Sequence, residues 1–265
     1  MIPRLLVGAP GIGKTAIINS QYSYCEVVLL STMTEEDISG LPYHEGSVEH
    51  RTEPPLFRRL REAAKQHEKV ALFFDEIDKA RREVADTLLT LIASRKVGEW
   101  TLPDNCDIWA AANPPEWGGG DGVSQAMQSR FCVIEYKPNL QSWLEWCGKE
   151  FDNHPVALGV MADISSARAP LLECTGEGWK WRLTCPRTWA LALRGTLSAT
   201  TAQEREEIAK GLLTGNAATA LLAHFVTATS VESSARSVAQ TAAQRLASNR
   251  TTRKPLRIDH DHPSH

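Results

Sequence analysis

The chain has 265 residues, enough for one large domain or two modest ones, and its apolar and charged fractions are those of a globular protein. A net charge of −3 excludes the overall basic character of a chain that coats nucleic acid or an anionic membrane. No signal peptide is evident and no apolar run reaches the roughly 18 residues of a membrane span, so we expect a cytoplasmic protein without a membrane segment. None of the six cysteines forms a C-x-x-C pair, which indicates free thiols. Those at 25, 106 and 132 lie in apolar runs, where we expect burial.

The first half of the chain alternates short apolar runs with amphipathic stretches. Strands are predicted at 2–7, 26–30, 70–74, 107–112 and 132–136, and helices at 14–20, 55–66 and 81–95. Strands separated by helices favour right-handed crossovers, so we predict an α/β fold with a parallel five-stranded sheet and helices on both faces. Two loops stand out: a predicted β-hairpin within 40–55, centred on Gly46, and a protruding turn at 98–105.

The pattern changes after Pro138. No strand is predicted beyond it, and helices are predicted at 140–151, 155–164, 186–196, 204–213 and 217–227. We therefore predict an α/β domain over 1–138, a small helical domain over 139–247 and a flexible polar tail over 248–265. The histidines and aspartates of the tail could chelate a metal, but a solvated tail is the simpler interpretation. Segment 173–181 has no predicted place.

A glycine-rich turn follows the first strand and matches G-x-x-x-x-G-K-[ST] in full. Its residues are Gly8, Ala9, Pro10, Gly11, Ile12, Gly13, Lys14 and Thr15, and Ala16 follows in the helix. Glycines let the backbone N–H groups point at phosphate oxygens, the lysine adds a point charge, and the threonine hydroxyl can ligate Mg²⁺. A chance match in a glycine-rich turn is the alternative, but the strand before the turn and the helix after it disfavour that. The sequence predicts that residues 8–16 bind a nucleotide.

Two acids end the third predicted strand. An acid at the carboxyl end of a parallel strand points into the ligand crevice, where Asp75 can hold Mg²⁺ through water. Glu76 is then placed to orient or deprotonate an attacking water. Alone, such a pair is more often a solvated strand end. Downstream of the phosphate-binding turn, it indicates a hydrolytic site.

Three further residues are weaker candidates. Asn113 ends the fourth strand, where its amide could bind a phosphate or the water, or could simply start a turn before two prolines. Arg130 could reach the nucleotide of a neighbouring subunit, or could be a surface arginine at a helix end. Arg187 lies in the first turn of a predicted helix, an unfavourable place for a cation, which suggests a phosphate contact.

The order of these motifs resembles that of the AAA+ superfamily, and most closely the MoxR-like ATPases of the branch that holds dynein-related and CbbQ/NorQ-type proteins. The resemblance implies strand order 5-1-4-3-2, a helical lid, and ATP and Mg²⁺ as cofactors. It also implies that Asn113 is sensor 1, Arg130 an arginine finger and Arg187 sensor 2. Family members usually carry a helix before the first strand that helps cover the adenine. Here the first strand starts at Ile2, which leaves base recognition open.

The resemblance also implies partners. Such ATPases form rings, usually hexamers, and remodel or activate a protein client, often with a partner that carries a von Willebrand factor A domain. Loops 40–55 and 98–105 would face the pore or the client. A nucleic-acid motor is not favoured, because loop 40–55 has one Arg and two His against three Glu. A small kinase usually lacks an arginine finger acting in trans and a sensor 2 domain, and would not need to oligomerise. Intact Lys14 and Glu76 argue against a silent nucleotide-binding scaffold.

Overall fold

The computed structural model describes residues 2–117, 122–176 and 181–227. Its internal contacts divide the chain into two compact units, the first made of 1–143 and 171–191, the second of 144–170 and the residues from 192 onward. The domain boundary at 138/139 stays a prediction. The tail 248–265, with its histidines and aspartates, lies outside the described residues.

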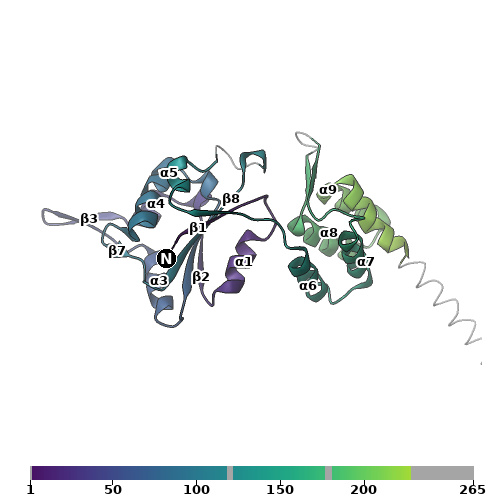
Figure 1. Ribbon diagram of the computed structural model, residues 1–265, viewed down its shortest axis with the longest axis horizontal. Helices are drawn as coiled ribbons and strands as arrows, with labels where there is room; N and C mark the ends of the chain where they lie inside the picture. The colour runs from purple at the N-terminus through teal and green to yellow at the C-terminus, as the bar shows by residue number, and fades with distance from the viewer. Residues whose placement is uncertain (1, 118–121, 177–180, 228–265) are drawn as a thin grey trace, which may run out of the picture. The chain divides into compact units, whose positions relative to one another are not determined.

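A five-stranded parallel sheet forms the centre of the first unit (Figure 1). Its strands are β1 (Arg4–Val7), β2 (Cys25–Leu29), β5 (Val70–Asp75), β8 (Cys106–Ala112) and β9 (Cys132–Glu135). They lie in the order β2-β5-β8-β1-β9, and every neighbouring pair is parallel. Read from the other edge, this is the expected order 5-1-4-3-2, so the predicted sheet is confirmed.

Helices cover both faces of this sheet (Figure 1). On one face, α1 (Lys14–Gln21) places Ile18 in a cluster with Phe73 and Trp109. The other face carries a larger apolar core, to which α2 (Glu35–Ser39), α3 (Pro55–Ala64) and α4 (Arg82–Ser94) contribute. The central strands β5 and β8 are buried along nearly their whole length, which explains why they are continuous apolar runs rather than alternating ones.

In the chain, two antiparallel hairpins lie between the strands of the first unit's parallel sheet, within residues 40–105. The predicted hairpin is confirmed: β3 (Pro42–Glu45) pairs with β4 (Val48–Arg51) and projects away from the sheet (Figure 1). The predicted turn at 98–105 belongs to a smaller hairpin, β6 (Lys96–Val97) with β7 (Trp100–Thr101). It starts earlier than expected because Arg95 ends α4 in a left-handed conformation with φ 58°.

Several short elements were not predicted. They are the α5 helix (Gln125–Gln128) and the 3-10 turns η1 (Leu30–Thr32), η2 (Ile77–Lys79) and η3 (Pro115–Trp117). Helix α2 had a readable signal, because Thr34 and Asp37 form a capping box at its start. The turn η2 matters most, since it directly follows the two acids that end β5.

Two predictions are wrong. Strands do occur after Pro138, since β10 (Glu173–Thr175) pairs with β11 (Arg182–Thr184). The first three residues of segment 173–181 therefore form a strand, and residues 177–180 lie outside the described part of the chain. Strands of three residues are too short to show an alternating pattern. Cys132 is exposed rather than buried, because it begins the edge strand β9. All six cysteines are free thiols.

The second unit is helical. The helices are α6 (Leu140–Glu150), α7 (Pro155–Ser165), α8 (Pro186–Ser198), α9 (Ala202–Leu212) and a helical stretch over 215–227. The first residues of α6 and α8 belong to the first unit. All five predicted helices are present, with bounds within a few residues. Val160, Leu193 and Leu221 are buried in this unit. Within the part of the chain that the structure describes, no helix is long and apolar enough to span a membrane.

Candidate nucleotide site

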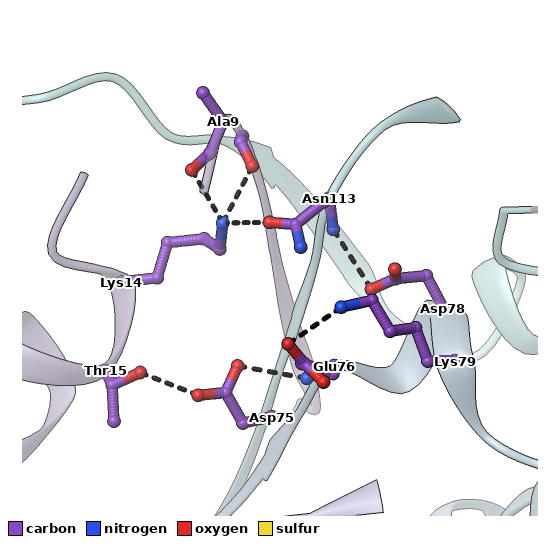
Figure 2. A network of polar contacts seen from close by, with 9 residues as sticks. Ala9, Lys14, Thr15, Asp75, Glu76, Asp78, Lys79 and Asn113 are labelled. Carbon is purple, nitrogen blue, oxygen red and sulfur yellow. Dashed lines mark hydrogen bonds and ion pairs between the residues drawn. The ribbon is translucent and has the colours of Figure 1, made fainter. Parts of the chain in front are cut away.

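Lys14 is the centre of a polar group at the start of α1 (Figure 2). Its side chain is buried, and Nζ donates hydrogen bonds to the Gly8 carbonyl at 2.7 Å, the Ala9 carbonyl at 2.9 Å and Asn113 Oδ1 at 2.8 Å. Burial lowers the pKa of Lys14 to about 8, while the nearby carboxylates of Asp75 and Asp78 act in the opposite direction. The ammonium therefore stays mostly protonated at neutral pH, as a phosphate ligand requires.

The start of α1 is suited to an anion. Gly13 precedes the helix with φ 97° and ψ 19°, a conformation that other residues adopt only with strain, and a Cβ there would face open space. No side chain caps the helix, and its first turn contains no acid. The unsatisfied N–H groups at such a helix end attract negative charge. The uncapped start of α1 therefore fits the phosphates of a nucleotide.

Thr15 and Asp75 provide oxygen ligands beside Lys14. The Thr15 hydroxyl donates to Asp75 Oδ2 at 2.8 Å, although the two residues come from α1 and the end of β5. Hydroxyl and carboxylate oxygens are the ligands that Mg²⁺ prefers. The predicted magnesium ligands are thus adjacent, and the donor set fits the ion.

Glu76 follows Asp75 in a left-handed backbone conformation, with φ 55° and ψ 45°. A residue with a side chain pays roughly 1–2 kcal/mol for this conformation, and such strain is concentrated at functional sites. Lys79 Nζ lies 2.9 Å from Glu76 Oε1. This hydrogen bond, together with one from Ser31, holds the pKa of Glu76 below its ordinary value. Glu76 is therefore ionised at neutral pH and able to accept a proton.

Asn113 lies in contact with Lys14, and its role as a ligand of a phosphate or of the attacking water stays a prediction. Its side chain contacts Lys14, and its backbone N–H donates to Asp78 Oδ1 at 3.0 Å. Asp78 and Lys79 were missed by the sequence reasoning. The run D-E-I-D-K that continues from Asp75 was the available signal, but it gives no partner for either residue.

The two arginines differ in position. The Arg187 backbone N–H donates to the Gly11 carbonyl at 3.1 Å, and its exposed side chain is near enough to act electrostatically on Lys14 and Glu76. Arg130 is exposed at the end of α5 and donates to the Ala126 carbonyl at 2.6 Å. Among the described residues, it is not a partner in the hydrogen bonds around Lys14. The remaining predicted residues, Pro10, Ile12 and Ala16, lie on the loop and the first turn of α1, where Ile12 is buried.

This geometry agrees with the family comparison. Residues 3–131 match the model of the AAA domain, dynein-related subfamily. This range, just under half of the chain, is similar to AAA domains of that subfamily. Members of this family bind nucleotides, and the matched range contains the whole polar group around Lys14. No protein of curated function matches the chain.

Solved structures with a similar fold include several mutants of RuvB from Thermotoga maritima. One of these mutants is 13% identical with a TM-score of 0.45, covering 84% of this chain and 62% of RuvB. A second is 14% identical with a TM-score of 0.46 and the same coverage of both chains, 84% and 62%. A proposed ATPase from Cytophaga hutchinsonii is 20% identical with a TM-score of 0.42, covering 57% of this chain and 46% of that protein. The chain thus spans less than two thirds of the RuvB chains that it matches.

Proposed function

We propose that the protein is an AAA ATPase that hydrolyses Mg-ATP. One observation carries this proposal: Lys14, Thr15, Asp75, Glu76 and Asn113 meet where β1, β5 and β8 end (Figure 2). Ligands of open parallel sheets bind at the carboxyl ends of the strands. The residues come from three separate segments of an AAA domain, so their convergence is a property of the fold and not of one motif.

Each residue has a role in this proposal. The backbone of residues 8–16 and the Lys14 ammonium hold the phosphates, and Thr15 and Asp75 hold Mg²⁺. When bound, the ion neutralises phosphate charge. Glu76 orients the attacking water and accepts its proton, while Lys79 keeps the carboxylate ionised. Asn113 orients the water or the γ-phosphate, and Arg187 contacts the phosphates within the same subunit.

We further propose a homo-oligomeric ring, a hexamer, in which Arg130 reaches the ATP of the neighbouring subunit. Its exposed position supports this, because an arginine that acts on a neighbour must lie at the surface. The domain predicted over residues 139–247 would form the lid. The ring would belong to the MoxR-like branch and remodel or activate a protein client, together with a von Willebrand factor A domain partner. The loops at 40–55 and 98–105 would face the pore or the client. The six free thiols are compatible with the expected cytoplasmic location.

The first experiment measures ATP turnover with Mg²⁺ for the wild type and Glu76→Gln. Loss of the general base should lower turnover by about 100-fold or more, while binding of a fluorescent ATP analogue stays near the wild-type value. Glu83→Gln, an exposed acid on α4, is the matched control and should behave as wild type. Normal turnover of Glu76→Gln would exclude Glu76 as the base.

The ring is tested separately by light scattering of Glu76→Gln with and without ATP, since this variant should retain its nucleotide. We expect a monomer or small species to become a hexamer when ATP is added. A monomer at every concentration, with hydrolysis intact in the wild type, would refute the ring while leaving the ATPase assignment in place.

A further inference from the structure

Asp78 is an acid that the hydrolytic roles above do not use. It lies in η2, three residues beyond Asp75, and only 8% of its surface is exposed. Its Oδ1 accepts the hydrogen bond from the Asn113 backbone N–H at 3.0 Å (Figure 2). Its Oδ2 is buried and, within the described part of the chain, has no hydrogen-bond partner. A buried carboxylate oxygen without a partner is costly, so the side chain needs an explanation other than stability.

The sequence around Asn113 shows why this single hydrogen bond matters. Asn113 is followed by Pro114 and Pro115, and a proline has no N–H group to donate. The N–H of Asn113 is therefore the last backbone donor at the end of β8, because the two prolines that follow cannot donate a backbone hydrogen bond. Its partner comes from another strand end, because η2 follows β5 and not β8. Asp78 thus ties the turn after β8 to the turn after β5.

The hydrogen bond from Asn113 to Asp78 also affects where the side chain of Asn113 lies. With its backbone held by Asp78, Asn113 places Oδ1 at 2.8 Å from Lys14 Nζ. The contacts therefore form one path from Asp78 through Asn113 to the residue that binds the phosphates. We propose that Asp78 is a positioning residue, which fixes the backbone of Asn113 so that its amide group faces the nucleotide. This inference rests on the proposed ATPase function.

The test compares two substitutions that separate the hydrogen bond from the charge. Asp78→Asn keeps a carbonyl oxygen for the Asn113 N–H, whereas Asp78→Ala removes the acceptor. A misplaced catalytic group commonly costs up to about 100-fold in rate, so we expect Asp78→Ala to lower kcat by about 10-fold to 100-fold. Nucleotide affinity should change by less than about threefold, because the loop of residues 8–16 is intact. Asp78→Asn should recover most of the lost kcat.

Asp107→Ala is the matched control. Asp107 is also 8% exposed, but it is the second residue of β8, at the far end of the strand from Asn113, and accepts a hydrogen bond from Tyr22 at 2.7 Å. Its loss should lower stability without a selective loss of kcat. A further comparison uses the Asn113→Ala background. Since residues that act through one another are not additive, Asp78→Ala should cause little further loss of kcat there.

Two results would overturn the proposal. One is a folded Asp78→Ala with wild-type kcat. The other is a folded Asp78→Asn whose kcat is as low as that of Asn113→Ala, which would assign the effect to the charge; this variant decides the matter if Asp78→Ala does not fold. If the wild type itself hydrolyses no ATP, the proposed function fails, and the positioning is tested by hydrogen exchange. The Asn113 amide should then exchange faster in Asp78→Ala than in Asp107→Ala, and equal exchange would refute the positioning.

Discussion

Two glycines of the loop between β1 and α1 are required for different physical reasons. At Gly8, a Cβ would lie 2.3 Å from the carbonyl oxygen of Tyr136, a backbone atom that cannot move aside. At Gly13, a Cβ would meet nothing within 4 Å, but φ is 97°. The first glycine is therefore needed for packing, and the second for the backbone conformation that directs the start of α1 at the nucleotide.

We expect Gly8→Ala and Gly13→Ala to separate stability from binding. Gly8→Ala should lower the free energy of unfolding by about 2–3 kcal/mol, because overpacking against backbone forces the strand ends apart. Gly13→Ala should cost only about 1–2 kcal/mol, yet weaken nucleotide binding more, because the N–H groups of α1 are displaced. Urea unfolding and titration with a fluorescent nucleotide measure both. The reverse ranking in either measurement would contradict this account.

Residues within one motif were predictable, whereas residues that meet across the fold were not. Lys14 and Thr15 lie in a contiguous pattern, and Asp75 and Glu76 end a recognisable apolar strand. The sequence left the role of Asn113 open, because an asparagine that starts a turn before two prolines fits the local pattern equally well. Only the pairing of β5 with β8 brings the turns that follow these strands close together. That proximity gives Asp78 a partner, and no local pattern contains it.

At the scale of elements, the β3–β4 hairpin is closed at its base and independent of the core. The Thr52 N–H donates to the Leu41 carbonyl, and the Leu41 N–H donates to Thr52 Oγ1, each at 2.9 Å. Every residue of β3 is exposed, and the hairpin provides no residue to the buried core of the sheet. It was predictable from Gly46 between two polar alternating runs. The three-residue strands β10 and β11 offered no such signal.

We expect that replacing residues 43–50 with a short Gly-Ser linker leaves the basal ATPase intact. Thermal unfolding should shift by only a few degrees, because little apolar surface is lost from the core. Any stimulation by a client should disappear. As a comparison, Leu102→Ala removes a side chain that is 2% exposed next to the second hairpin and should cost about 2–5 kcal/mol. A large loss of stability in the hairpin replacement would show that it supports the fold.

At the scale of the whole molecule, the proposed ring predicts that two inactive variants recover activity when they are mixed, which a site within one subunit could not do. Arg130→Ala and Lys14→Ala should each abolish turnover when purified alone. Mixed together, they should recover measurable turnover, because an intact Lys14 site can then face a neighbour with an intact Arg130. Mixing Arg130→Ala with the Lys14→Ala, Arg130→Ala double variant should recover none. If Arg130→Ala alone hydrolyses ATP normally as an oligomer, this residue is not the arginine finger.

The return of residues 171–191 to the first unit affects how the protein is made in a cell. Cys185 approaches the nucleotide loop so closely that a Cβ on Gly11 would lie 2.7 Å from its sulfur. A ribosome synthesises the complete parallel sheet first, then the segment 144–170 of the other unit, and only afterwards the residues that lie against Gly11. Contacts so distant in the chain form late during synthesis. A gene fragment that stops after β9 would therefore encode the whole parallel sheet, but the loop of residues 8–16 would lack the residues that lie against Gly11.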